Sequence, residues 1–162
     1  MSTHLCNFTT LSDAQKAMVL AWRNHEAIKA YMYNTHDISE AEHLNFIESL
    51  KSRTDKCYFL VQHEGIDIGV IDFNDLSEHS ATLGVYANPN LTQKGLGSLL
   101  MNAIIDYAFH TLNVRFLKAD VFADNMKAKA LYEKYGFCEK KRTTIHHKEL
   151  ICMELENENR SF

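Results

Sequence analysis

The chain has 162 residues and a mass of 18.6 kDa, which is the size of one ordinary domain whose core needs no disulfides. Its formal net charge is −4, from 17 Lys and Arg against 21 Asp and Glu, and like charges are nowhere concentrated, which argues against a dedicated nucleic-acid-binding protein. No stretch approaches the ~20 apolar residues that cross a bilayer, and the first residues lack a signal-peptide pattern, so we expect a cytoplasmic protein that binds no membrane.

The first half of the chain alternates helical and strand patterns. Ser39 followed by Glu42 is a capping-box signature, and apolar residues at helical spacing follow it. Two strand-like runs flank a Glu-Gly turn at 64–65, and the apolar phase switches between Val70 and Ile71, which indicates either a bulge or burial on both faces. The elements expected are a strand over 4–8, a helix from Ser12 or Asp13 towards Trp22, a helix over 39–52, and strands over 57–63 and 66–74.

The second half continues the meander and then alternates helix and strand. A strand over 81–87 stops at an Asn-Pro-Asn segment, and a glycine-containing segment over 93–98 opens a long helix with a broad apolar face. The remaining elements expected are a strand over 117–122, a helix over 125–135, and strands over 137–142 and 145–155. This order predicts an α+β fold, with a mostly antiparallel mixed sheet of about six to seven strands flanked by about four helices.

Two glycines, Gly95 and Gly97, lie in the sequence Lys-Gly-Leu-Gly-Ser that links the third meander strand to the long helix. Unpaired backbone N–H groups and the helix dipole attract phosphate at such a start, and glycine lets an anion approach closely. A dinucleotide-binding loop would have a third glycine where Leu100 stands, and a Walker loop would continue with Lys-Ser or Lys-Thr. On its own, the pair is also explained by a plain strand-to-helix turn.

A second motif covers residues 125–137. Its apolar side chains recur at helical spacing, which is typical of an ordinary buried helix face. In that interpretation, Asn125 only caps the helix and Gly136 only ends it in the left-handed conformation. The motif gains weight because it lies one helix and one strand after the glycine turn.

Together, the two motifs resemble those of the GCN5-related N-acetyltransferases (GNAT). The acetyl-CoA loop of that family reads Arg/Gln-x-x-Gly-x-Gly/Ala after a proline, and its later motif reads Asn-x-x-Ala-x-x-x-Tyr-x-x-x-Gly-Phe. The residues that match are Pro89, Gly95, Gly97, Asn125, Ala128, Tyr132, Gly136 and Phe137. The Arg/Gln position is Thr92 here, with Gln93 one residue along, so one side-chain contact is unmatched while the backbone cradle is kept. The resemblance covers residues 4–155 and implies a GNAT fold, an N-acetyltransferase and acetyl-CoA as co-substrate.

The resemblance also implies which residues hold acetyl-CoA. The family separates two strands and lays the pantetheine arm between them, near Val85 or Tyr86, where a backbone N–H would hold the reacting carbonyl oxygen. Asn125 is implied to hydrogen-bond the pantetheine arm, and Tyr132 to protonate the departing thiolate. The other residues implied to contact acetyl-CoA are Ala87, Gln93, Lys94, Gly95, Leu96, Gly97 and Ser98.

A closer resemblance rests on residues 22–25, 42–47, 58–61, 68–73 and 86–91. These segments look like those of the nucleotide-sugar N-acetyltransferases of pseudaminic acid biosynthesis, which acetylate the 4-amine of UDP-4-amino-4,6-dideoxy-N-acetyl-β-L-altrosamine on the route to a sugar that decorates bacterial flagellin. The implied partner is a UDP-linked amino sugar, and a homodimer stays open. Two other functions stay open: a protein N-terminal acetyltransferase of the ribosomal type, which also carries a Trp-Arg-Asn element, and a non-catalytic acyl-CoA-binding module.

The reaction needs a base, because an amine attacks a thioester only when neutral and free amines with a pKa of about 8 are mostly protonated at pH 7. Asp120 is the first candidate, since several family members carry a glutamate base at this place on the strand before the Asn125 motif. Its shorter side chain favours a water relay, and the alternative is a solvent-facing carboxylate without a role. His25 competes as a base, because an imidazole titrates near neutral pH.

The segment over 22–25 supplies the predicted acceptor contacts. The planar guanidinium of Arg23 suits a diphosphate or a sugar carboxamide. Asn24 and His25 are predicted to bind the same substrate. The alternatives are an ion pair between Arg23 and Glu26, and a cap or turn made by His25.

Neither metal nor disulfide chemistry is expected. Four cysteines lie far apart without a Cys-x-x-Cys pair, as expected for free thiols in a reducing compartment. None of the nine histidines is spaced with another metal ligand, and His146 and His147 are predicted to point to opposite faces of a strand. One domain is expected over residues 1–155, followed by a polar tail over 156–162.

Overall fold

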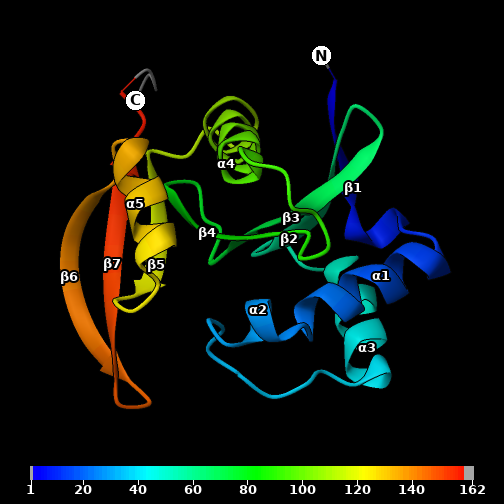
Figure 1. Cartoon of the computed structure of the whole chain (residues 1–162). Coiled ribbons are helices and arrows are strands. Elements are labelled where there is room, and N and C mark those ends of the chain that lie inside the picture. The colour runs from blue at the N-terminus through cyan, green and yellow to red at the C-terminus, as the bar shows by residue number, and fades with distance from the viewer. Residues whose placement is uncertain (1, 159–162) are drawn as a thin grey trace.

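A sheet with strand order β1-β2-β3-β4-β5-β7-β6 runs through the centre of the molecule (Figure 1). The structure is a computed structural model that describes residues 2–158. Neighbouring strands are antiparallel except for β4 and β5, which run parallel. The strands are β1 (Thr3–Asn7), β2 (Cys57–His63), β3 (Ile66–Asn74), β4 (Ser80–Ala87), β5 (Phe116–Phe122), β6 (Cys138–Ile145) and β7 (Lys148–Glu156). This sheet confirms the predicted α+β fold.

The helices begin where capping residues stand in the sequence. Ser12 and Ser39 cap α1 and α3, each in a capping box with the third residue of its helix. The helices are α1 (Asp13–Arg23), α2 (Glu26–Lys29), α3 (Glu40–Leu50), α4 (Leu96–Asp106) and α5 (Met126–Lys134), with a 3-10 turn over Phe8–Thr10 and a π-helical turn over Tyr107–Thr111. The sequence pattern missed α2, which is a single turn without a buried residue. Within residues 2–158, each helix is too short or too polar to cross a membrane.

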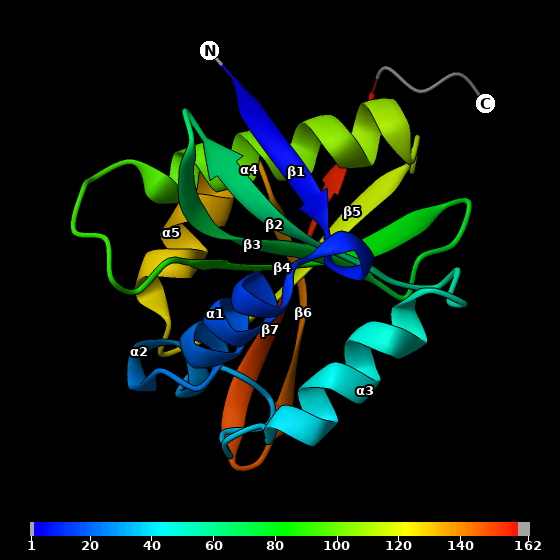
Figure 2. The same ribbon diagram turned by 90° about the vertical axis from the view of Figure 1, so that its right-hand side faces the viewer.

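Helices cover both faces of the sheet, and each face has its own hydrophobic core. α4 and α5 pack on one face, where Leu100, Ile104 and Tyr132 are buried. α1 and α3 pack on the other face around Trp22 and Ile47, as Figure 2 shows. Since burial of a large apolar side chain is worth ~1.5–3 kcal/mol, packing on the sheet fixes both layers.

β3 is buried on both faces, which is one of the two alternatives predicted at its centre. Val70 belongs to the core beneath α1 and α3, whereas Ile71 belongs to the core beneath α4. The register between β2 and β3 does shift, but at Val61/Gln62, nearer the turn than the sequence indicated. The predicted turn over 64–65 is confirmed, with positive φ at both residues.

His146 and His147 form the turn between β6 and β7, so the prediction that they lie within a strand is wrong. Their φ angles are 51° and 65°, and the flanking residues Ile145 and Lys148 pair across the hairpin. Two consecutive residues with positive φ match the twist of a tight hairpin. Such turns are usually marked by glycine or asparagine, and two histidines give no such signal.

The end of β7 continues past the predicted domain boundary. The strand runs to Glu156, and Asn157 is buried, with its backbone N–H donating to the carbonyl of Arg115 at 2.8 Å and its side-chain amide donating to the carbonyl of Val114 at 3.1 Å. The fold therefore includes the first residues of the predicted polar tail. Residues 159–162 of that tail lie outside the described residues.

Candidate active site

β4 and β5 part halfway along their length and leave an opening in the sheet. Their ladder runs from Ser80 opposite Phe116 to Leu83 opposite Ala119 and stops there. Beyond that point β4 continues beside β3, and β5 continues beside β7. Within residues 2–158, the backbone of Val85, Tyr86 and Ala87 thus has a strand partner on one side only. The separation of two strands that the resemblance implied is present at these residues.

The turn before α4 has an uncapped helix start. Gly95 stands at the N-cap with φ at 89°, a conformation that glycine adopts without strain, and it makes no side-chain cap. The first N–H groups of α4 are therefore free of a side-chain cap, which suits an anion. Gln93 and Lys94 before it are exposed, whereas Leu96 is buried.

Gly97 and Ser98 connect α4 to α5. A Cβ at Gly97 would lie 3.0 Å from Cδ2 of Leu131, so the missing side chain lets α4 and α5 pack closely here. The Ser98 hydroxyl accepts from Nζ of Lys134 at 3.2 Å, and its carbonyl accepts from the hydroxyl of Tyr135 at 3.1 Å. The predicted cofactor loop is thereby tied to the helix of the second motif.

Asn125 and Tyr132 begin and line α5. The Asn125 amide oxygen accepts from the N–H of Ala128 at 3.3 Å, so it caps the helix. Tyr132 is 5% exposed and packs against Phe137 at a ring distance of 5.5 Å. Burial raises the pKa of Tyr132 most, with further increases from two carboxylates, Asp72 and Asp120. Its phenol therefore keeps its proton at neutral pH.

Asp120 lies on β5 directly after the last residue paired with β4. Its side chain is exposed and accepts a hydrogen bond from the Tyr33 hydroxyl at 3.2 Å. The ring of Tyr33 packs edge-on against Phe122 at 5.7 Å. The loop after α2 is thus brought to the opening, a contact that the sequence did not predict because 87 residues separate Tyr33 from Asp120.

Asp72 is a second carboxyl at the opening, and sequence analysis missed it. It lies on β3 opposite Gly84 and is 7% exposed. The amide of Asn74 donates to its Oδ1 at 2.6 Å. Burial raises the pKa of Asp72 to about 7, while the Asn74 hydrogen bond and Lys56 act in the opposite direction. The available signal was a lone carboxyl in the otherwise apolar run Ile-Gly-Val-Ile-Asp-Phe.

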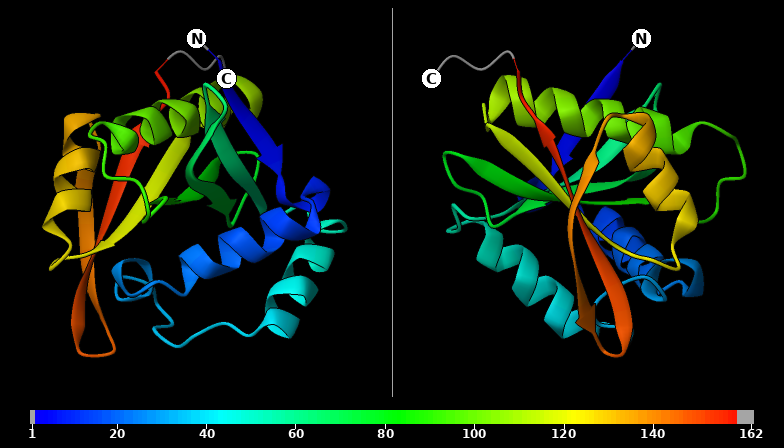
Figure 3. Two further views of the ribbon diagram at one scale, coloured as in Figure 1. Left: turned by 45° about the vertical axis from the view of Figure 1, so that its right-hand side comes forward. Right: turned by 90° about the vertical axis from the view of Figure 1, so that its left-hand side faces the viewer.

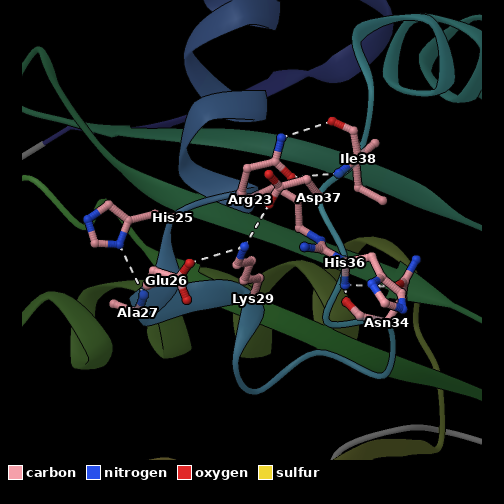
Figure 4. A network of polar contacts seen from close by, with 10 residues as sticks. Arg23, His25, Glu26, Ala27, Lys29, Asn34, His36, Asp37 and Ile38 are labelled. Atoms are coloured by element: carbon pink, nitrogen blue, oxygen red, sulfur yellow. Dashed lines mark hydrogen bonds and ion pairs between the residues drawn. The ribbon is translucent and has the colours of Figure 1, made fainter.

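Arg23, the last residue of α1, links this helix to the loop after α2 (Figure 4). Its Nη2 donates to the carbonyl of Asn34 at 2.7 Å, while its buried Nη1 has no partner among the described residues. Burial is the largest influence on Arg23 and lowers its pKa. Electrostatic interactions with Tyr86 and Asp37 act in the opposite direction and raise it. The alternative partner Glu26 pairs with Lys29 at 3.1 Å instead.

Asn24 and His25 make structural contacts beside Arg23. The Asn24 amide donates to the carbonyl of Ile38 at 2.9 Å and accepts from its N–H at 2.7 Å. Nδ1 of His25 accepts from the N–H of Ala27 at 3.0 Å, which makes it the cap of α2, and its ring points away from Arg23 in Figure 4. These contacts hold the loop after α2, which contains Tyr33 and the Asn34 carbonyl that Arg23 contacts.

Two clefts border the opening. Figure 3 shows the β6–β7 hairpin extending on the side where α2 and the following loop lie. A cleft of about 440 Å³ between them is lined by Met32, Tyr33, Asn34, Thr35, His36, Phe122, His146 and Lys148. A second cleft of about 270 Å³ follows β5, β7 and β6 and is lined by Thr82, Lys118, Asp120, Lys140, Lys141, Cys152, Met153 and Glu154. Residues 2–158 contain no cluster of metal-ligating side chains.

Comparisons with known proteins agree with this arrangement. The model of the acetyltransferase (GNAT) family matches residues 16–137. The chain is 46% identical over 133 residues to acetyltransferase PseH of Campylobacter jejuni subsp. jejuni serotype O:23/36 (strain 81-176), which covers 82% of this chain and 83% of that protein. PseH of the C. jejuni strain ATCC 700819 is 44% identical over the same share.

Solved structures give the same result. The crystal structure of C. jejuni N-acetyltransferase PseH in complex with acetyl coenzyme A superimposes with a TM-score of 0.80 at 36% identity and covers 96% of this chain and 99% of that one. Spermidine N-acetyltransferase from Vibrio cholerae shares the fold, with a TM-score of 0.84 at 21% identity over 95% of each chain. The chain is therefore an acetyltransferase of the GNAT family, the family that its two motifs resemble.

Proposed function

We propose that this enzyme transfers an acetyl group from acetyl-CoA to the 4-amine of UDP-4-amino-4,6-dideoxy-N-acetyl-β-L-altrosamine, a step of pseudaminic acid biosynthesis that precedes flagellin glycosylation. The observation that carries the acceptor class is that Lys118, Lys140 and Lys141 line the same cleft as Asp120. Lysines attract a diphosphate and a carboxylate attracts an ammonium, and a nucleotide-linked amino sugar carries both groups. The identity to the two C. jejuni PseH proteins supports the same acceptor.

Acetyl-CoA is proposed to bind at the opening between β4 and β5, beside the start of α4. The uncapped start of α4 suits its pyrophosphate, with residues 93–98 around it. The backbone over 85–87, unpaired on the side of the opening, suits the amide groups of a pantetheine arm, and Asn125 stands at the far end of β5. The structure of the C. jejuni PseH protein in complex with acetyl coenzyme A supports this co-substrate.

The proposed chemistry is direct transfer. Tyr132 protonates the departing thiolate, because its raised pKa keeps a proton on the phenol until a strong base forms beside it. A backbone N–H near Val85 or Tyr86 holds the carbonyl oxygen as its negative charge develops. Of the two residues predicted as the base, Asp120 lies at the opening, whereas Nδ1 of His25 caps α2, so the contacts speak against His25.

An acceptor panel tests this function. Release of the thiol from acetyl-CoA would be measured with the UDP-4-amino sugar, with UDP-N-acetylglucosamine and with an N-terminal peptide. We expect turnover with the amino sugar alone. Turnover of the peptide would assign an N-terminal acetyltransferase, and acetyl-CoA binding without turnover of any amine would assign a non-catalytic module.

Replacement of Arg23 tests the acceptor contact directly. The unpartnered Nη1 is proposed to donate to the diphosphate or to a sugar carbonyl. A charge-assisted hydrogen bond of about 1.5–3 kcal/mol means that Arg23→Ala raises the KM for the amino sugar by about 10–100-fold, with the KM for acetyl-CoA unchanged. Arg53→Ala is the matched control, because Arg53 is exposed and pairs with Asp55. Equal KM values in the two variants would remove Arg23 from the acceptor site.

Location and assembly follow as lesser proposals. Both proposed substrates are soluble metabolites, which supports the cytoplasmic location expected from the sequence. A homodimer stays a prediction that light scattering of the purified protein tests. A monomer at working concentration would contradict it without affecting the acceptor proposal.

A further inference from the structure

Three residues form a row across the sheet at the level of the opening. Asp72 of β3 pairs with Gly84 of β4. Leu83 pairs with Ala119, so Asp120 stands next to Gly84 at the first position where β4 and β5 no longer pair. Two carboxyl-bearing residues thus flank a residue without a side chain, one on each side of the opening.

Both carboxyl side chains point to the face on which the acceptor is proposed to bind. Strand neighbours point to opposite faces, and the neighbours of Asp72 and Asp120 lie in the core beneath α4 and α5. These neighbours are Ile71, Phe73, Ala119 and Val121. An amine that enters from the face of α1–α3 therefore meets Asp72 and Asp120 before it reaches the opening.

Gly84 allows the Asp72 carboxylate to lie over the backbone of β4. A Cβ at this position would overlap both carboxylate oxygens of Asp72. The missing side chain therefore leaves the carboxylate at the edge of the opening rather than directing it away. Oδ1 accepts from Asn74, whereas Oδ2 accepts no hydrogen bond from a described residue. One oxygen is thus held in place and the other is available to a substrate.

The groups that face Asp72 come from several elements. Lys56, just before β2, favours the ionised carboxyl. Burial raises the pKa values of the Tyr58, Tyr86 and Tyr132 phenols and of the Cys57 thiol most, and Asp72 adds to each increase. Arg23 acts on the same phenols of Tyr58 and Tyr86. Asp72 therefore acts electrostatically on groups of both faces of the sheet, including Tyr132.

We propose that Asp72 is the general base of the acetyl transfer, and that Asp120, together with Tyr33, binds and orients the incoming amine. This inference rests on the proposed acetylation of an amine at the opening. A base works best when its pKa lies near the working pH, and burial brings that of Asp72 to about 7. Asp120 differs because it is exposed and its carboxylate already accepts from Tyr33.

The proton balance closes with Tyr132. The bound ammonium first loses one proton to water. The neutral amine nitrogen then forms a C–N bond with the thioester carbonyl carbon and releases a second proton to the Asp72 carboxylate. The C–S bond breaks, its electron pair stays on sulfur, and the thiolate takes the proton of Tyr132. The proton on Asp72 then returns to the Tyr132 phenolate directly or through water, which restores both residues and leaves an amide and the CoA thiol.

The experiment compares Asp72→Asn with Asp120→Asn in single-turnover acetyl transfer across pH 5.5–9, a design that separates chemistry from product release. We expect Asp72→Asn to lower the rate by about 10²–10⁴-fold and to remove the contribution of the carboxyl to the fall in rate at acid pH, so that only the titration of the amine remains. Asp120→Asn should raise the KM for the amine and keep that fall. An acid limb with the same shape in Asp72→Asn as in the wild type, or one that changes only in Asp120→Asn, would overturn the assignment.

Asn74→Ala keeps the test informative if Asp72→Asn does not fold. Without the Asn74 amide the ionised carboxyl is less stable, so the acid limb should move to higher pH, with a rate about threefold lower near pH 6.5 and an unchanged plateau. A purely structural role would lower the plateau instead, which would contradict the proposal. If the wild type does not acetylate the amino sugar, the proposed function fails, and the variants are compared on the amine of the panel that it does acetylate.

Discussion

The two faces of the sheet divide the work of the enzyme differently. The α4–α5 face is an apolar core whose loops carry both recognised motifs, and its polar contacts tie helix to helix. The α1–α3 face has a smaller core and places Asp72, Arg23 and Tyr86 around the opening. On the α4–α5 face, the groups proposed to bind acetyl-CoA are mainly backbone groups and glycines, which do not depend on particular side chains. The second face depends on individual side chains, and it is where acceptor choice and proton transfer are expected to lie.

The largest test of this contrast is the pH dependence of stability. Burial on the α1–α3 face raises the Asp72 pKa from 3.8 to about 7, so the folded state prefers the protonated carboxyl. The stabilisation is fully present below pH 3.8, falls as the unfolded chain ionises, and is gone above about pH 7. The difference between the two pKa values corresponds to about 4 kcal/mol. We therefore expect the free energy of unfolding of the wild type, minus that of Asp72→Asn, to decrease by about this amount between pH 4 and pH 7.

Urea unfolding at several pH values measures this difference, and Asp75→Asn is the control. Asp75 follows three residues later and is exposed, so its difference curve should stay flat. A flat curve for Asp72→Asn as well would mean that the carboxyl ionises as it does in water, and the contrast between the two faces would lose its main energetic term.

Tyr132 joins the two faces, and its replacement gives the next largest effect. Tyr132→Phe removes only the hydroxyl of the proposed proton donor, so kcat should fall by about 10²–10³-fold while the Kd for acetyl-CoA changes less than about threefold. Tyr107→Phe is the matched control, because Tyr107 packs on Phe59 and Phe73 within the α4 core. Steady-state thiol release and calorimetric titration supply the two numbers. A loss of acetyl-CoA affinity in proportion to kcat would assign Tyr132 to binding instead.

The sequence predicted what local chemistry specifies. Capping boxes at Ser12 and Ser39 and the left-handed Gly136 lie within one helical turn of the elements that they begin or end. The strand opening was reached only through the family resemblance, because backbone periodicity does not show where a ladder stops. The two motifs therefore predicted the family and the fold, and the residues that they assign to acetyl-CoA stay a prediction.

The face proposed for the acceptor was predicted poorly because its contacts join distant parts of the chain. Tyr33 meets Asp120 across 87 residues, and the position of Asp72 beside the opening depends on Gly84 in the next strand. Alternation alone marks Asp72 as an ordinary strand residue. The prediction failed at the hairpin turn of His146 and His147 for a different reason: two histidines do not mark a tight turn as glycine or asparagine does.

The smallest predicted effect separates Gly95 and Gly97, the two glycines at the start of α4. Gly95 has positive φ and open space around its Cα, so Gly95→Ala should lower the free energy of unfolding by about 1–2 kcal/mol through backbone strain. Gly97→Ala brings a Cβ to 3.0 Å from Leu131 but favours the helix, so a net effect below about 1 kcal/mol is expected.

A double-mutant cycle distinguishes these two causes. In a Leu131→Ala background the contact at Gly97 is gone, so Gly97→Ala should become stabilising, while the effect of Gly95→Ala should stay the same. Urea unfolding of the four Gly97 and Leu131 variants measures the coupling. If both glycine substitutions respond equally to the loss of Leu131, then packing against α5 constrains the whole turn, and the backbone cradle proposed for acetyl-CoA depends on the helix of the second motif as much as on its own glycines.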